Sequence, residues 1–285
     1  ASVKPDVVIM DIHMPGMDGY KATRAIMETH PVPIVIYSHL VAPEQSENIF
    51  KALQAGAVAV AQKPPGMDSP EAEPIVSKLL RTVKLMAEVK VVRRIPQKQK
   101  KHLPLSANLI PSPQKTTDIK LIAIGASTGG PPVLQQLFRD LPSDFPIPIV
   151  VVQHIATGFL PGMLDWLSRE TRLALKIPRT GDSLMSGHVY FAPEEGNMGV
   201  SDSGKVLITN SSGKGHLKRP VSYLFTSVAK HYEKNAVGIL LTGMGNDGAA
   251  GLKEMKLRGA ETLVQDRETA TVFSMPQEAI KLDAV

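Results

Sequence analysis

The hydrophobic and polar positions of the first 65 residues alternate between short apolar runs and longer stretches with helical spacing. Short apolar runs are typical of buried strands, and apolar residues three and four apart are typical of helices. The expected strands lie at residues 7–10, 34–37 and 57–61, and the expected helices at 20–29 and 44–55. This order predicts a parallel sheet with crossover helices. Three strands are few for a doubly wound domain, so we expect residues 1–68 to form a partial one.

The pattern changes over residues 69–118. A helical stretch opens at Ser69-Pro70 and continues to about Val92, with apolar residues at helical spacing. Residues 95–118 then contain four prolines among polar residues and have little periodicity. Such a composition is typical of an extended linker, so we expect this region to be a helix followed by a flexible, basic linker.

Residues 119–285 return to apolar runs alternating with helical stretches, which predicts an α/β domain with a doubly wound parallel sheet. The expected strands are 121–124, 149–152, 237–241 and 262–264, and the expected helices are 132–141, 160–172, 220–233 and 249–257. Two further apolar runs, at 189–191 and 206–208, are separated by a stretch that includes Asp202-Ser203-Gly204. We expect these two runs to pair as a β-hairpin inserted into the domain.

The composition narrows the chemistry. The 285 residues are 43% hydrophobic, enough for two cores, and include no cysteine, which excludes disulfides, thiolate metal sites and a cysteine nucleophile. No apolar run approaches the ~18 residues of a membrane-spanning helix, and the N-terminus lacks the pattern of a signal peptide. We therefore expect a cytoplasmic protein without membrane insertion.

The basic excess is confined to one segment. The 32 Lys and Arg residues outnumber the 27 Asp and Glu residues by five, and residues 88–118 contain seven basic residues against two acidic ones. The rest of the chain is therefore formally neutral. A basic linker without interleaved aromatic residues is more typical of a solvated tether than of a nucleic-acid-binding face, so we expect no nucleic-acid partner.

A glycine-rich turn, GASTGG at residues 125–130, joins an expected strand to an expected helix and matches the G-x-S-x-G pattern. In such a turn the glycines relieve crowding, and the serine hydroxyl, here that of Ser127, is exposed at the end of the sheet. Two other interpretations remain open, a phosphate-binding loop and a merely tight turn. The chain has neither the lysine of a P-loop nor the G-x-G-x-x-G spacing here.

Two more polar residues follow expected parallel strands. His154 comes directly after 149–152 and has the position of a general base, although many histidines are only structural. Asp247 lies in a glycine-rich loop after 237–241, where it can orient an imidazole or simply form a turn. Together with Ser127 they predict a nucleophile, a base and an orienting acid, with backbone N–H groups of the turn or of residues 243–245 holding an oxyanion. The chain order Ser, His, Asp differs from that of α/β-hydrolases, trypsin-like proteases and subtilisin-like proteases.

Several motifs resemble the catalytic domain of the CheB methylesterase family over residues 119–285: GASTGG, VVQH, GHVYFAP, RPVSYLF, LLTGMGNDGAAG and VFSMP. Residues 11–19, with Ser38 and Lys63 after the following strands, resemble the flavodoxin-like receiver domain that this family carries at its N-terminus. The resemblance implies hydrolysis of glutamate methyl esters on chemoreceptors in bacterial chemotaxis, with deamidation of certain receptor glutamines. It implies no cofactor for the esterase reaction.

The resemblance also implies roles for particular residues. Ser127 would be the nucleophile, His154 the base and Asp247 its orienting acid, and Thr128 and the Met244 backbone would line the site. In the receiver, Asp11 would accept a phosphoryl group from a histidine kinase. Ser38 and Lys63 would contact the phosphate, and Mg²⁺ would bind beside Asp11 with the His13 carbonyl. The implied partners are the kinase and the cytoplasmic domain of a methylated chemoreceptor.

Three positions depart from the family pattern. Nothing before Asp11 supplies the acidic pair of a receiver Mg²⁺ site, so we expect an N-terminally truncated receiver. Val60 stands where receivers usually have an aromatic residue, and Asn197 where the family often has histidine. The alternative hypothesis is a non-enzymatic response regulator whose output domain binds a partner, or binds a nucleotide through the glycine-rich turn.

Overall fold

The computed structural model describes residues 4–38, 43–64, 66, 69, 72–89, 91, 118–210 and 220–285. They form an N-terminal unit up to residue 91 and a C-terminal unit from residue 118. The elements of the N-terminal unit are β1 (Val8–Asp11), α1 (Gly19–Thr29), β2 (Ile34–Ser38), α2 (Pro43–Ala55), β3 (Ala59–Gln62) and α3 (Ala72–Ala87). Its three strands are parallel in the order β1-β2-β3, as predicted.

Local signals in the sequence set the helix ends of the N-terminal unit. The Asp18 side chain accepts a hydrogen bond from the Lys21 backbone N–H at 2.7 Å and thereby caps the start of α1. At the end of α2, Gly56 has a φ of +117°, and the Ala57 N–H donates to the Ala52 carbonyl at 2.9 Å. Only glycine adopts such a backbone readily, so Gly56 ends the helix and turns the chain into β3.

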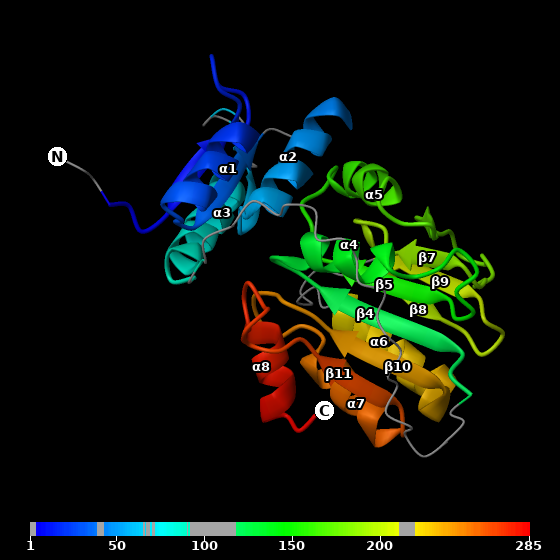
Figure 1. Ribbon diagram of the computed structural model, residues 1–285. Helices are drawn as coiled ribbons and strands as arrows, with labels where there is room; N and C mark the ends of the chain where they lie inside the picture. Colours follow the sequence, from blue (N-terminus) through cyan, green and yellow to red (C-terminus); the bar gives the residue numbers. More distant parts are fainter. Residues whose placement is uncertain are drawn as a thin grey trace, which may run out of the picture.

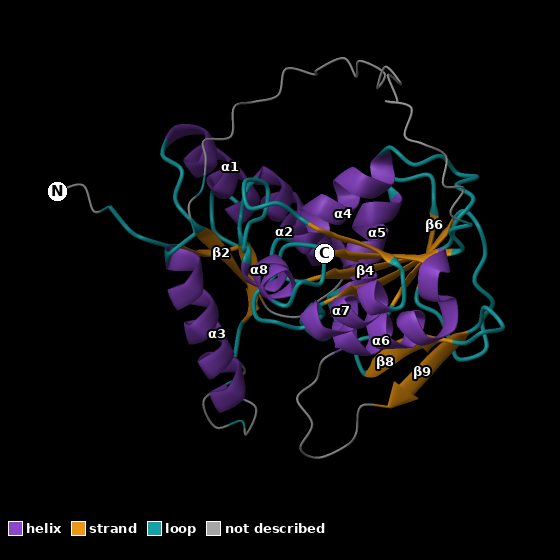
Figure 2. Cartoon of the chain, turned by 90° about the horizontal axis from the view of Figure 1, so that it is seen from below, coloured by secondary structure: helices purple, strands orange, loops and turns teal. Residues whose placement is uncertain are grey.

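The C-terminal unit is a six-stranded sheet, parallel throughout, in the order β11-β10-β4-β5-β7-β6. Its elements are β4 (Leu121–Ala126), α4 (Gly130–Arg139), β5 (Ile149–Gln153), α5 (Leu160–Ser168), β6 (Ala174–Lys176), β7 (His188–Phe191), β8 (Gly196–Val200), β9 (Val206–Asn210), α6 (Pro220–Tyr232), the 3-10 helix Glu233–Asn235, β10 (Ala236–Leu240), α7 (Ala249–Leu257), β11 (Glu261–Val264) and α8 (Ser274–Lys281). Helices α4 and α5 cover one face of the sheet, and α6, α7 and the β8–β9 pair lie on the other (Figure 2). The predicted doubly wound sheet is confirmed.

An inserted hairpin is present, but the prediction that residues 189–191 form its first strand is wrong. Residues 189–191 belong to β7, which pairs in parallel with β5 and β6 in the main sheet. The antiparallel partner of β9 is β8, where Met198 pairs with Ile208. The apolar run of β7 is buried on both faces, as is usual for a parallel strand. In β8, by contrast, the apolar residues are interrupted by glycines and by Asn197, so the sequence has no clear strand pattern.

Other boundaries shift by a few residues. Helix α5 ends at Ser168, whereas the pattern predicted a helix over 160–172. The helix expected from residue 69 is α3, and the linker expected over residues 95–118 lies, apart from Asp118, outside the described residues. Among the helices that the structure describes, none is both long and apolar enough to cross a bilayer.

The two units are packed against each other. Figure 1 shows α2 of the N-terminal unit beside α5 of the C-terminal unit, and Phe50 of α2 stacks on Trp166 of α5, with ring centroids 5.3 Å apart and planes at 19°. A second contact places Val272 and Met244 of the C-terminal unit in a cluster with buried residues of β2 and β3, among them Val35 and Ala61. The N-terminal unit therefore covers the edge at which the parallel strands of the large sheet end.

Candidate active site

The three strands at the centre of the large sheet end side by side, and two of the predicted site residues follow them directly. Ser127 comes after β4, and its N–H donates to the Thr242 carbonyl, just beyond β10, at 3.0 Å. His154 comes after β5, and its N–H donates to the Ala126 carbonyl at 2.8 Å. Backbone hydrogen bonds thus hold the serine turn between the two neighbouring strand ends. This is where open α/β sheets bind their ligands.

Asp247 lies on the same edge and contacts the histidine. Its Oδ2 is 2.8 Å from His154 Nε2. The carboxylate also accepts the N–H groups of Val221 and Ser222, at 3.0 and 2.9 Å, in the first turn of α6. Burial raises the pKa of the Asp247 carboxyl, but the hydrogen bonds from the His154 ring and from the two backbone groups outweigh it and hold the pKa below its usual value. The group is therefore an ionised carboxylate at neutral pH.

This contact decides which nitrogen of the imidazole is available for chemistry. Because an ionised carboxylate only accepts hydrogen bonds, Nε2 of His154 carries the proton that faces Asp247, and the lone pair of the neutral ring is on Nδ1. Ser127 is only 8% exposed, and its hydroxyl makes no hydrogen bond to the His154 ring or to any other described residue. The structure thus contains the histidine–carboxylate half of the predicted array, whereas the serine–histidine bond is not formed.

The structure places the two predicted lining residues differently: Thr128 follows the serine and lines the cavity beside it, and Met244 packs on the N-terminal unit next to Gly243. Within the described residues, the backbone N–H groups of Thr128 and Met244 donate no hydrogen bond. The loop that carries Met244 packs closely on the nucleophile: a Cβ atom on Gly243 would lie 2.7 Å from Ser127 Cβ. Glycine is required at this approach, and it brings the Met244 peptide to the serine.

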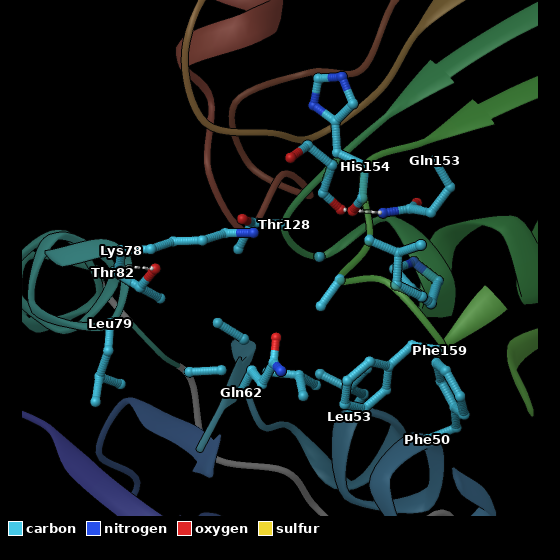
Figure 3. Close-up of a pocket in the computed structure, with 18 of the residues that line it drawn as sticks. Phe50, Leu53, Gln62, Lys78, Leu79, Thr82, Thr128, Gln153, His154 and Phe159 are labelled. Carbon is cyan, nitrogen blue, oxygen red and sulfur yellow. Dashed lines mark hydrogen bonds between the residues drawn. The ribbon is translucent and has the colours of Figure 1, made fainter. Parts of the chain in front are cut away.

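The sequence did not identify Gln153 as a site residue. Its Nε2 donates to the carbonyl oxygens of Ser127, at 2.8 Å, and of His154, at 2.9 Å, as Figure 3 also shows. The Gln153 amide leaves no room beside the serine turn, because a Cβ on Gly130 would lie 2.1 Å from Oε1. The amide therefore braces the serine turn against the end of β5. No local pattern predicts this contact, because the side chain folds back across to a different strand.

The predicted phosphate-site residues also gather at strand ends, those of the small sheet. Asp11, Ser38 and Lys63 lie at or just after the ends of β1, β2 and β3. The Lys63 ammonium forms an ion pair with the Asp11 carboxylate, and the Lys63 N–H donates to the Ser38 carbonyl at 2.9 Å. Burial raises the pKa of Asp11, but the Lys63 ammonium and the His13 N–H outweigh it and lower the pKa below its usual value.

A metal site on the N-terminal unit is not complete in the part of the chain that the structure describes. No group of three or more described His, Asp or Glu residues is placed to hold a metal ion. Asp11 provides a carboxylate, but Lys63 pairs with it, and His13 contributes its N–H to the same carboxylate at 3.1 Å. Mg²⁺ prefers six oxygen ligands. These residues alone do not fit the ion, and their assignment as metal ligands remains a prediction.

A partly open cavity of about 200 Å³ lies at the interface between the units, next to the site (Figure 3). Leu53 and Gln62 line it from the N-terminal unit, and Ser127, Thr128 and His154 from the C-terminal unit. In Figure 3 the His154 ring lies on the side of the cavity opposite Leu53 and Gln62. In this arrangement the N-terminal unit therefore obstructs the approach of a large substrate to Ser127.

Comparison with known proteins gives consistent matches over both units. Residues 122–285 match the family model described as CheB methylesterase, and residues 1–71 match the response regulator receiver domain. A Geobacter metallireducens protein named protein-glutamate methylesterase/protein-glutamine glutaminase 4 is 45% identical, over 100% of this chain and 82% of its own length. A similarly named Syntrophus aciditrophicus protein is 44% identical, over 99% and 81%. The crystal structure of the Thermotoga maritima CheB methylesterase catalytic domain aligns with a TM-score of 0.55 at 35% identity, over 59% of this chain and 90% of that one.

Proposed function

The chain belongs to the CheB methylesterase family, with a receiver domain before the esterase domain, and from this premise we propose that it hydrolyses glutamate methyl esters on chemoreceptors and deamidates specific receptor glutamines. The observation that carries the proposal is the ionised Asp247 carboxylate 2.8 Å from His154 Nε2, at the strand end next to Ser127. A base held by an anion beside a hydroxyl is the arrangement that activates a serine nucleophile.

In the proposed mechanism, Ser127 Oγ attacks the ester carbonyl while His154 Nδ1 takes the hydroxyl proton. The resulting imidazolium is stabilised by Asp247 and returns the proton to the leaving methoxide, which departs as methanol. Water then attacks the acyl-enzyme, with His154 again as base, and releases glutamate; with glutamine the leaving group is ammonia. Such base catalysis contributes about 10²–10⁴ to the rate.

The tetrahedral intermediate needs donors for its oxyanion. The candidates are the N–H groups of Thr128, which follows Ser127 in the chain, and of Met244, which follows the closely packed Gly243; neither donates a hydrogen bond within the described residues. Each donor to an oxyanion contributes about 3–4 kcal/mol to transition-state stabilisation. The esterase reaction uses only these protein groups. For it to proceed, the Ser127 hydroxyl and the His154 ring must close to hydrogen-bond distance, about 2.6–3.2 Å.

The direct test is methanol release from the methylated cytoplasmic domain of a chemoreceptor. We expect the full chain to release methanol in proportion to the methyl groups present, with no added cofactor. An unmethylated receptor that retains the target glutamines should instead yield ammonia. If neither product forms, and a nucleotide raises the melting temperature of the chain, a binding function of the glycine-rich turn replaces the proposal.

We assign the receiver domain the role of regulating access to Ser127. Asp11 accepts a phosphoryl group from a histidine kinase in the cytoplasm, and Ser38 and Lys63 contact that group. In the unphosphorylated chain the Lys63 ammonium pairs with the Asp11 carboxylate, and after phosphorylation it pairs with the phosphoryl group. Gln62, the neighbour of Lys63, lines the cavity beside Ser127, so a change at the phosphorylation site is one residue from the interface.

The stacked pair Phe50 and Trp166 gives a test of this regulation. We expect Phe50→Ala to raise the basal rate of methanol release roughly 2- to 12-fold. A stacked aromatic pair contributes about 0.5–1.5 kcal/mol beyond its buried area, so its loss favours the form in which the N-terminal unit is released from the strand ends and Ser127 is accessible. The measurement is the initial rate of the unphosphorylated full chain.

The matched control is Met27→Ala. Met27 is a buried residue of α1, which packs on α2 and β1, so its loss weakens the receiver domain without removing the ring stack. The role of the interface is contradicted if Phe50→Ala leaves the basal rate unchanged, or if both variants raise it equally.

A further inference from the structure

The loop that carries Met244 is held by a residue that has no role in the mechanism above. Ser274, the first residue of α8, donates its hydroxyl to the Gly243 carbonyl at 2.8 Å and accepts the Gly245 N–H at 3.0 Å. One side chain thus bonds to both residues that flank Met244. The hydroxyl donates its single proton to the Gly243 carbonyl and accepts the Gly245 N–H with one of its two lone pairs.

The bond to Gly243 fixes the direction of the Met244 N–H. The Gly243 carbonyl and the Met244 N–H belong to one planar trans peptide, so they point in opposite directions. The carbonyl is turned toward the start of α8, where it accepts both the Ser274 hydroxyl and the Met275 N–H, the latter at 3.1 Å. The N–H must therefore point away from α8.

The direction of the Met244 N–H matters because the loop packs closely on Ser127. Gly243 approaches Ser127 so closely that a Cβ atom would lie 2.7 Å from Ser127 Cβ. The carbonyl is also polarised by its two donors, which strengthens the N–H on the other side of the same peptide.

The flanking residue Gly245 is held less firmly. It has a φ of +97°, a backbone that favours glycine, and within the described residues its N–H bonds only to the Ser274 hydroxyl. Without that hydroxyl the peptide between Met244 and Gly245 would lose its fixed partner in the protein. The loop would then be free to sample other orientations next to Ser127, on which Gly243 packs.

We propose that Ser274 is a positioning residue of the esterase site, which holds the Gly243–Met244 peptide so that its N–H donates to the oxyanion. The inference rests on the proposed function, because it needs Ser127 to form a tetrahedral intermediate. Ser274 itself does not contact the reacting atoms. Its effect is therefore on the transition state, where the oxyanion develops, and not on the binding of the ground-state ester.

The test compares Ser274→Ala with Ser274→Thr in the full chain. Removing an oxyanion donor costs about 10²–10³ in kcat, and misaligning one costs part of that, so we expect Ser274→Ala to lower kcat roughly 10-fold with KM unchanged. Ser274→Thr, which keeps the hydroxyl, should restore most of kcat. A control, Ser186→Ala, removes a hydroxyl that bonds the Pro146 carbonyl at 2.6 Å on the exposed surface, and should leave kcat unchanged.

Each variant is assayed on the methylated receptor and on p-nitrophenyl acetate, an activated ester that needs the nucleophile and the oxyanion donors but no receptor recognition. A kcat of Ser274→Ala within twofold of the parent, an equal loss in Ser274→Ala and Ser274→Thr, or a loss that appears only in KM overturns the inference. If the parent chain hydrolyses p-nitrophenyl acetate but not the receptor ester, the proposed function fails, while the Ser274 variants still decide this inference on the activated ester.

Discussion

Replacing Ser127 with alanine is expected to lower kcat for methanol release by about 10⁴- to 10⁶-fold, the range found when a serine nucleophile is removed from a hydrolase of this kind. Without Oγ no acyl-enzyme forms, and His154 has no hydroxyl to deprotonate. The remaining rate would come from the oxyanion donors acting on a water molecule. The measurement is methanol release from the methylated receptor under single-turnover conditions, where a slow rate is still visible.

This variant separates chemistry from stability unusually well. Among the described residues the Ser127 hydroxyl has no hydrogen-bond partner, so its loss should leave the melting temperature of the chain within a few degrees of the parent value. A variant that folds normally and retains more than one hundredth of the parent kcat would show that Ser127 is not the nucleophile. A variant that also loses stability would instead indicate that the hydroxyl has a structural partner in the folded chain.

Much of the fold follows from patterns that are local in the sequence. The apolar runs at β4, β5 and β10 are short and continuous, which is typical of strands buried on both faces. A polar residue directly follows β4 and β5, and Thr242 follows β10 after Leu241. Because parallel strands end on the same edge, the order of strands and helices was enough to place Ser127 and His154 together. The glycine-rich turn singled out Ser127 as the candidate nucleophile, because G-x-S-x-G is typical of a turn that exposes a serine hydroxyl.

What the sequence could not predict depends on contacts between distant residues. The strand β8 was missed because Gly196 and Asn197 interrupt its apolar alternation, and its partner is chosen by packing. Gln153 and Ser274 were missed because a single polar side chain gives no local signal of the carbonyl that it contacts. The sequence also did not predict the packing of the two units. Phe50, which stacks on Trp166 across the interface, has the position of an ordinary core residue of an amphipathic helix.

The second large effect is expected at Asp247. We expect Asp247→Asn to lower kcat by about 10⁴-fold, as loss of the orienting carboxylate does in a serine triad. Three donors face this side chain, the His154 ring and the N–H groups of Val221 and Ser222. An asparagine offers one oxygen and one NH₂ group, so at least one donor loses its acceptor, and the imidazolium formed in the reaction is no longer stabilised by a negative charge.

The same substitution should weaken the fold in a way that depends on pH. A carboxyl with a lowered pKa in the folded state contributes stability that is fully present above its unfolded pKa and is lost as the pH falls through the folded value. We therefore expect Asp247→Asn to be less stable than the parent by about 1–3 kcal/mol at pH 7, with the difference shrinking as the pH falls below the usual aspartate pKa of about 3.9. Urea unfolding at several pH values measures it.

The matched control is Asp182→Asn, because Asp182 is an exposed aspartate that accepts the Arg179 N–H at 2.9 Å and has no histidine partner. It should leave kcat unchanged, and it should change the free energy of unfolding by no more than a few tenths of a kcal/mol. If Asp247→Asn keeps kcat within tenfold of the parent while its stability falls as expected, Asp247 serves only to cap α6. The loss of both quantities, with the control unchanged, would show that one carboxylate fixes the start of the helix and the tautomer of the base together.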